Sequence, residues 1–530
     1  MTWFSSLGAR RLALLAVLFV IGVACAQVER DYDDDTSSAG KGGASAGSAG
    51  AETAGKAGAP IGGQPGSAGE AGQGGEAGQG GSAGENAAGA GGAPNGTLSI
   101  IMAGDGKGTV ASDVPGIDCN ANCSADFDPD TTLVLTATAA MGSTFTGWSG
   151  GGCTGTGKCT LQVADVPEVT ATFMLDRVLT VTKAGTGSGT VTSASMGINC
   201  GADCDEVVPH GSVVTLSATP TTGSGSIFTG WSGGGCSGTG TCAVTVTEAT
   251  QVTATFACSG TTTIMYSGVI TSFVVPTCVT ALTIDAYGAQ GGNAGPYLGG
   301  YGARIKGTVT VTGGSTLKVL VGGRGLDAFD TGQQAAGSGG GGTFVASATN
   351  APLMVAGGGG GAMNYTPTYL AAGIGGGITT AGLAATSGAG AGGTAGNGGV
   401  TAAWTGWHTG TGGGGFAGNG VNDTTGSAAS YGTPYSPGKA FLNGGTGGQP
   451  GSCGTLTTCI AGRAGGFGGG GAAGFTGGGG GGYSGGGGGD FVSGATVGSG
   501  GGGGGSYNAG TAQTNTAATN PGAGKLVFSW

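Results

Sequence analysis

Hydrophobic and polar positions alternate with a period of two along many short segments between residue 97 and the C-terminus. The pattern is clear in residues 132–139, 252–256, 280–286 and 305–311, where Val and Thr are frequent. Successive side chains of a strand point to opposite faces of a sheet, so this period predicts β-strands. Gly-rich turns separate the segments, and the sequence therefore predicts an all-β protein.

Residues 97–177 and 178–257 repeat one another. Both contain GTV, then FTGWSGGGC, then a closing VTATF, in the same order. Trp148 and Trp231 occupy the same place in this motif. An indole buries a large apolar area, so we expect each Trp to anchor the core of its repeat. The alternative is that each forms an aromatic platform for a ligand.

The chain has 13 cysteines, of which Cys25 stands apart from three sets of four. An even number of cysteines in an exported protein predicts disulfides formed in an oxidising compartment. Other connectivities are open within each set, but closeness in sequence favours the pairs Cys119–Cys123, Cys153–Cys159, Cys200–Cys204 and Cys236–Cys242 in the repeats. In residues 258–530, Cys258–Cys278 could tie the entry of the domain to its first strand, and Cys453–Cys459 could close a small loop. A small domain has a marginal core, which such disulfides would support.

The N-terminus has the pattern of an export signal over residues 1–24. Arg10 and Arg11 precede the apolar run 12–23, which is too short to span a bilayer as a helix. The sequence GVAC at residues 22–25 resembles a bacterial lipobox, in which Cys25 carries the lipid. ACA at residues 24–26 fits ordinary signal peptidase instead. We expect the lipid anchor, with a secreted product as the alternative.

Residues 25–96 consist mainly of Gly, Ala, Ser, Glu and Gln, and the hexapeptide EAGQGG occurs twice in succession at residues 70–81. This stretch has almost no aliphatic side chain to bury. Such a composition cannot offset the conformational entropy lost on folding. We therefore predict a disordered tether between the anchor and the folded domains.

Runs of glycine lie between the strand-like segments of residues 258–530, at positions 357–361, 412–415, 477–482, 485–489 and 500–505. Glycine loses the most conformational freedom on folding, so ordered runs need many backbone hydrogen bonds. Threefold extended helices without side chains can approach closely and bond to one another. The sequence predicts packed polyglycine helices, and unfolded runs are the alternative.

The charge of the chain limits its partners. The formal net charge is −11 and only 8% of residues are charged. Binding to nucleic acid depends on Lys and Arg that neutralise phosphates, so we expect no nucleic-acid partner. For the same reason we expect no polybasic attraction to a membrane, and we expect membrane contact through the lipid anchor only.

No catalytic constellation is visible in the sequence. GYSGG at residues 482–486 matches a hydrolase pattern, but that chemistry needs a His after Ser484, and His210 and His408 both precede it. Asp126, Asp128 and Asp130 have calcium-loop spacing without the turn glycine or the final Glu. We predict no enzyme activity, no cofactor and no metal.

Two family resemblances refine the fold. The ordered motifs GTV, FTGWSGGGC and VTATF in residues 97–257 resemble the divergent internalin-type B repeats of bacterial surface proteins. That resemblance implies small β-grasp-like domains strung in tandem as a stalk or adhesive module, without enzyme activity. The disulfide-forming cysteines are additions to the shared pattern.

Residues 258–530 resemble the glycine-rich domain of the anaplastic lymphoma kinase and leukocyte tyrosine kinase receptors. The resemblance rests on LMVAGGGGGA at residues 353–362, GGGGGGYSGGGGGD at residues 477–490 and the closing GKLVFSW. It implies a jelly-roll-like sandwich from which polyglycine helices project as a packed bundle. In the receptors this domain takes part in ligand recognition.

The expected function is adhesion or recognition at the bacterial envelope, with an unknown surface protein or glycan as partner. Trp404 and Trp407, in the sequence WTGWH, are the candidate patch for a sugar or partner protein. The alternative function is that of a structural spacer or matrix component without a specific ligand.

Overall fold

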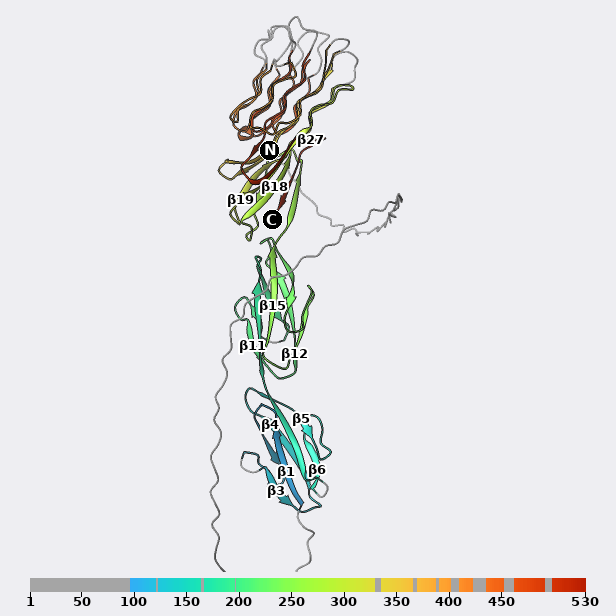
Figure 1. Ribbon diagram of the computed structural model, residues 1–530, viewed down its shortest axis with the longest axis vertical. Helices are drawn as coiled ribbons and strands as arrows, with labels where there is room; N and C mark the ends of the chain where they lie inside the picture. The colour runs from blue at the N-terminus through green and yellow to red at the C-terminus, as the bar shows by residue number, and fades with distance from the viewer. Residues whose placement is uncertain are drawn as a thin grey trace, which may run out of the picture. The chain divides into compact units, whose positions relative to one another are not determined.

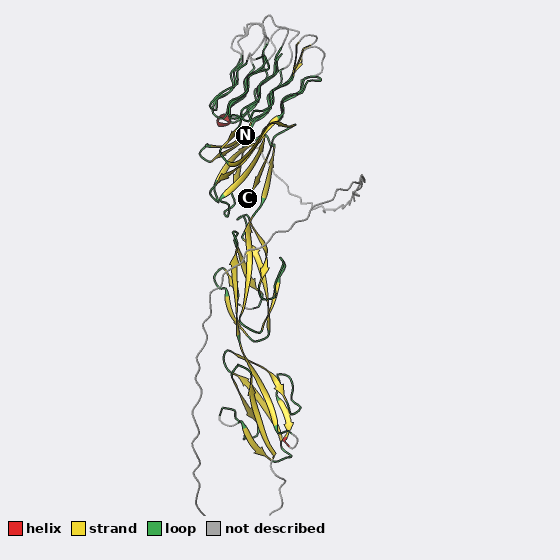
Figure 2. Cartoon of the chain, in the orientation of Figure 1, coloured by secondary structure: helices red, strands yellow, loops and turns green. Residues whose placement is uncertain are grey.

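The computed structural model describes residues 96–120, 123–163, 166–195, 197–328, 335–365, 369–387, 390–401, 409–422, 435–451, 462–490 and 498–530. These residues form an all-β protein, as the sequence predicts (Figures 1 and 2). Within them there is no α-helix, and η2 (Phe441–Asn443) is a single 3-10 turn. No helix in these ranges has the length and apolar character that crossing a membrane requires.

Repeat 1, residues 97–177, consists of a four-stranded sheet of order β3-β1-β7-β5 and a three-stranded sheet of order β2-β4-β6. β1 and β7 run parallel, and the other neighbours are antiparallel. The strands are β1 (Gly96–Ala103), β2 (Gly108–Ser112), β3 (Ser124–Phe127), β4 (Thr132–Ala139), β5 (Ser143–Ser149), β6 (Cys159–Gln162) and β7 (Glu168–Leu175).

Repeat 2, residues 178–257, has the same arrangement with one additional short strand. Its sheets have the orders β11-β8-β15-β13 and β10-β9-β12-β14, and β8 and β15 run parallel. The strands are β8 (Arg177–Ala184), β9 (Gly189–Ser193), β10 (Asn199–Cys200), β11 (Asp205–Val208), β12 (Ser212–Pro220), β13 (Ser226–Ser232), β14 (Cys242–Val246) and β15 (Thr250–Cys258).

Each repeat has its own hydrophobic core between its two sheets. In repeat 1, Leu133 and Leu135 of β4 are fully buried, and they meet Leu98 of β1 and Val169 of β7. The alternation that predicted a strand at residues 132–139 is therefore the alternation between core and solvent. The parallel pairing of the first and last strands resembles the centre of a β-grasp, while a second sheet covers the core.

The head, residues 258–530, contains a sandwich of two five-stranded antiparallel sheets, of orders β16-β28-β18-β19-β27 and β17-β20-β22-β23-β26. Their strands are β16 (Thr261–Met265), β17 (Thr271–Val274), β18 (Ala281–Tyr287), β19 (Gly302–Thr310), β20 (Thr316–Leu320), β22 (Thr343–Ser347), β23 (Pro352–Ala356), β26 (Tyr507–Asn508), β27 (Thr511–Asn520) and β28 (Lys525–Ser529). A small third sheet consists of β21 (Ala335–Ala336), β24 (Met363–Tyr365) and β25 (Tyr369–Ala371).

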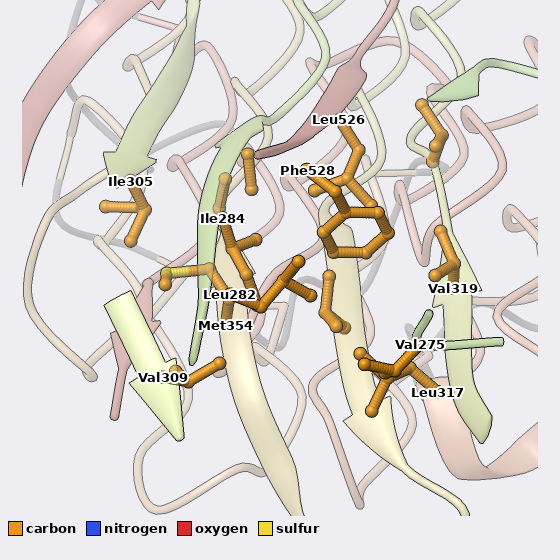
Figure 3. Packing of buried hydrophobic residues seen from close by; sticks show 14 of the residues in the cluster. Val275, Leu282, Ile284, Ile305, Val309, Leu317, Val319, Met354, Leu526 and Phe528 are labelled. Carbon is orange, nitrogen blue, oxygen red and sulfur yellow. The ribbon is translucent and has the colours of Figure 1, made fainter. Parts of the chain in front are cut away.

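The sandwich core lies between the two large sheets (Figure 3). Ile284 of β18 and Phe528 of β28 project from one sheet, and Leu317 and Val319 of β20 project from the other. Phe528 also stacks on Phe273, with ring centroids 4.3 Å apart. This packing explains why the chain ends on the alternating sequence LVFSW: its last strand lies inside the sheet, between β16 and β18.

The glycine runs leave the sandwich at one end, between its strands (Figure 1). They bond to one another with a period of three. In run 477–483, every third N–H donates to the same neighbouring run, and the acceptor advances by three as well. The donor and acceptor pairs are Gly478 and Gly337, Gly481 and Gly340, Gly479 and Thr411, Gly482 and Gly414, Gly480 and Gly502, and Tyr483 and Gly505.

A period of three identifies threefold extended helices, in which three neighbours are bonded in rotation. We call this assembly the glycine bundle; it comprises the described glycine-rich segments between residues 288 and 506. A second pair of runs has the same period in the opposite direction, because Ser499, Gly502 and Gly505 donate to residues 490, 487 and 484. The described parts of residues 375–450 take part, since Gly377 donates to Gly504. The glycine runs are therefore ordered by backbone hydrogen bonds.

Candidate functional site

Several predicted site residues lie outside the described residues: Cys25, Trp404, Trp407, Cys453 and Cys459. So do the predicted signal, residues 1–24, and the predicted tether apart from Gly96. The other ten cysteines are paired in the structure. The disulfides Cys119–Cys123, Cys153–Cys159, Cys200–Cys204 and Cys236–Cys242 are the pairs favoured from the sequence, and Cys258–Cys278 is the pairing suggested for the entry of the head.

The two repeat tryptophans are core residues, as predicted. Trp148 and Trp231 are only 4% and 5% exposed, so neither offers a face to a ligand. Their indole N–H groups donate to the carbonyls of Gly157 and Gly240, both at 2.7 Å. Each indole therefore holds a loop that a disulfide also closes, Cys153–Cys159 in repeat 1 and Cys236–Cys242 in repeat 2.

The FTGW sequence shared by the two repeats has a local structural cause. β5 carries a bulge between Phe145 and Gly147, where its register against β7 shifts. Gly147 has a φ of 146°, a conformation that side chains disfavour. The bulge brings the Phe145 ring to 5.1 Å from the Trp148 ring in an edge-on contact. Repeat 2 has the same bulge and ring pair, which explains why both copies contain these residues.

An aromatic column connects the sandwich to the glycine bundle. Phe344 of β22 stacks on Phe441 of η2 at 5.2 Å, and Phe441 stacks on Phe416 at 5.1 Å. The column continues through Tyr483, which stacks on Tyr507 of β26 at 4.8 Å. Sequence reasoning missed this cluster, because its members are isolated aromatics separated by long glycine runs.

Hydroxyl side chains inside the bundle serve its backbone. Ser484 is fully buried, and its Oγ accepts a hydrogen bond from the Gly396 N–H at 3.1 Å. Ser506 accepts from the Gly357 N–H and donates to the Gly377 carbonyl. The serine of the hydrolase-like pattern is thus a partner for backbone groups within the bundle.

A charged cluster lies on the outer side of the sandwich. Arg304 of β19 forms a two-bond ion pair with Asp285 of β18, at 2.9 and 2.7 Å. The Arg304 guanidinium and the Lys525 ammonium both lie over the Tyr287 ring, at 5.3 and 4.4 Å from its centroid. Burial raises the pKa of Tyr287, and the Asp285 charge adds to this. The hydrogen bond to Asp285 raises the pKa of Arg304.

This cluster follows from strand register. Tyr287 is opposite Arg304 on one side and opposite Lys525 on the other. Cross-strand neighbours of opposite charge or of cation and aromatic type stabilise a sheet. Asp285 and Tyr287 alternate with the buried residues Ile284 and Ala286, so both face away from the core, while their partners on other strands carry no signal in the sequence.

Repeat 1 has an open hollow of about 640 Å³ at one end, beside Met102, Lys107, Asn120 and Phe173. In repeat 2 the residue matching Met102 is Lys183, whose Nζ donates to the Gly189 carbonyl at 3.1 Å.

The described residues contain no group of three His, Cys, Asp or Glu side chains that could hold a metal. Asp126, from the calcium-like spacing, accepts a hydrogen bond from Thr97 at 2.6 Å.

Comparison with protein families supports the repeat prediction. Residues 98–177 and 179–260 each match the family model described as divergent InlB B-repeat domain. Repeats of this type are bacterial surface repeats, which is compatible with a role in adhesion or recognition. Comparison with curated proteins finds no match. The likeness of the head to receptor glycine-rich domains and the lipid anchor at Cys25 stay predictions.

Proposed function

We propose that this chain is a non-catalytic protein of the bacterial envelope, anchored through a lipid at Cys25, whose head recognises a surface protein or a glycan. The observation that carries this proposal is the tandem match of two domains to a bacterial surface repeat. Each repeat also has its own core and two disulfides, which suits modules displayed in an oxidising compartment.

The head is the recognition module in this proposal. The described residues on both sides of Trp404 and Trp407 belong to the glycine bundle, where Gly399 donates to the Gly413 carbonyl at 2.8 Å. A bundle held by such bonds is a rigid support, and rigid supports suit the presentation of binding loops. Trp404 and Trp407 are the residues we propose for partner contact.

One observation favours the second candidate, a structural spacer without a ligand. The backbone groups of the bundle form hydrogen bonds with one another, and the buried hydroxyls of Ser484 and Ser506 form hydrogen bonds with backbone groups of the bundle. A domain whose polar groups are largely satisfied internally offers few side chains for specific recognition. The spacer role therefore predicts that the head adds no saturable binding.

Binding to intact cells and isolated envelopes separates the two functions. We would compare residues 97–530 with residues 97–257, which end before Cys258. Recognition predicts saturable binding that needs the head and weakens in Trp404→Ala/Trp407→Ala. Leu298→Ala is the control, because Leu298 is an exposed apolar side chain of the head outside the proposed patch. Equal or absent binding by both chains would favour the spacer.

The lipid anchor has its own test. Metabolic labelling with a fatty acid should mark the full chain, and Cys25→Ala should lose both the label and the membrane association. An unlabelled chain, whose N-terminus follows Ala26, would instead indicate ordinary signal cleavage and a secreted protein.

A further inference from the structure

The two outer strands of one large sheet of the sandwich differ in how they are protected. In the sheet of order β16-β28-β18-β19-β27, the outer strands are β16 and β27. β27 shifts register twice against β19, and its Ala512 and Ala518 have left-handed φ values of 47° and 51°. Such bulges prevent a further strand from pairing with an edge.

β16 has none of this protection. Its five residues, Thr261–Met265, pair with β28 in continuous register, without a bulge. The segment from residue 259 to residue 275 contains no charged residue, and β16 contains no proline. Lys, Pro and bulges are the usual devices against strand addition, and none of them is present here.

The free backbone groups of β16 can be assigned from its pairing. Gly260 and Trp530 exchange two hydrogen bonds of 3.0 Å, next to the first residue of β16. Bonded pairs alternate along an antiparallel ladder, so Thr262 and Ile264 bond to β28. The N–H and C=O groups of Thr261, Thr263 and Met265 therefore point away from the sheet.

Exposed apolar side chains gather beside this edge in the chain. Met265 is 60% exposed, Val269 58% and Val274 62%, and Tyr266 and Ile270 are also exposed. These five residues fall within ten positions that include the end of β16 and all of β17. Met265 lies on β16 itself, so an exposed apolar side chain belongs to the edge where a second strand would pair.

We propose that β16 pairs with β16 of a second copy of this chain, which joins the two five-stranded sheets into one continuous sheet. An antiparallel pair around a two-fold axis places Thr263 opposite Thr263, and Thr261 opposite Met265. Any charge at the centre of such an interface would face its own copy. The uncharged sequence TTTIM is self-complementary in this register, and all three outward-facing residues find backbone partners.

The mass of the purified full chain, measured by sedimentation equilibrium over a range of concentrations, tests this pairing. The proposal predicts a dimer. Thr263→Asp should weaken dimerisation about tenfold or more, because the two carboxylates would face each other. Thr516→Asp, on the bulged edge β27, is the matched control and should leave the dimer unchanged. Melting curves of both variants check that they fold.

A crosslinking variant gives a second measurement that does not depend on destabilising the fold. Thr263→Cys should form an intermolecular disulfide under mild oxidation, identified by peptide mapping as residue 263 joined to residue 263. Thr516→Cys should not. A wild-type chain that stays monomeric, a Thr263→Asp chain that dimerises normally, or equal crosslinking of both cysteine variants would overturn the proposal. If the chain is monomeric, the unpaired edge of β16 would instead be available for a strand from another protein.

Discussion

Gly479 and Gly486 lie in adjacent helices of the glycine bundle, so close that a Cβ at Gly479 would sit 2.1 Å from the Gly486 carbonyl oxygen. No backbone can accept that contact without moving. The glycine of this run is therefore required by packing, since its φ is not left-handed. Nearly all neighbouring glycines meet backbone atoms at similar distances.

Gly479→Ala should destabilise the head by about 2 kcal/mol or more, because one methyl group must push two backbone segments apart. Hydrogen exchange, followed by mass spectrometry on peptides of the head, would measure the loss. Gly377→Ala is the matched control, since its Cβ would meet Leu383 at 3.5 Å, an ordinary contact. If both variants exchange like wild type, the bundle is not packed as described.

Many strands could be predicted from the sequence, because their residues alternate between the core and the solvent. The expected strand at residues 132–139 is β4, and the segment 280–286 differs from β18 by one residue at each end. The disulfide pairs of the repeats could also be predicted from the sequence, because their cysteines are only four or six residues apart.

Other features carried little or no sequence signal. β27 reads TAQTNTAATN and is exposed along nearly its whole length, so it has no apolar alternation. The partners within the glycine bundle could not be assigned, because glycine has no side chain to distinguish one run from another. The aromatic column depends on those assignments, since Phe416 and Tyr483 meet only once the runs are packed.

Trp148→Phe should destabilise repeat 1 by about 1–3 kcal/mol, since it removes the bond to the Gly157 carbonyl and leaves a void. Hydrogen exchange should rise in residues 97–177 and stay unchanged in repeat 2, which has a separate core. Trp231→Phe should give the reverse pattern. A change in both repeats from either variant would show that they unfold as one unit.

Loss of the Cys258–Cys278 disulfide should cost about 3 kcal/mol, because the bond closes a loop with a sequence separation of 20. Cys119→Ser/Cys123→Ser is the comparison, since that pair is also partly buried but spans only four residues. The shorter loop should cost about 2 kcal/mol. Denaturant unfolding measures the two free energies, followed in the head for the variant without Cys258–Cys278 and in repeat 1 for Cys119→Ser/Cys123→Ser. Equal costs would indicate that loop entropy is not the main contribution.

Asp105 holds the end of repeat 1 through two kinds of contact. Its carboxylate accepts a 2.9 Å hydrogen bond from the Leu175 N–H and pairs with the Arg177 guanidinium. The backbone hydrogen bond is the main reason why the pKa of Asp105 lies below its ordinary value of 3.8, and Arg177 adds to it. In repeat 2, Thr186 occupies the same position and accepts from the Cys258 N–H.

Because the pKa of Asp105 is lower in the folded chain, its ionised form stabilises repeat 1 at neutral pH. That stabilisation should begin to fall as the pH drops to about 4 and disappear below the folded-state pKa. Asp105→Thr should keep the Leu175 bond, as Thr186 does in repeat 2, and lose this acid dependence. Asp105→Ala should lose the bond as well and be the least stable at pH 7. Denaturant unfolding of repeat 1 at neutral and acid pH measures both effects; an Asp105→Thr chain as acid-sensitive as wild type would assign the dependence to another carboxylate.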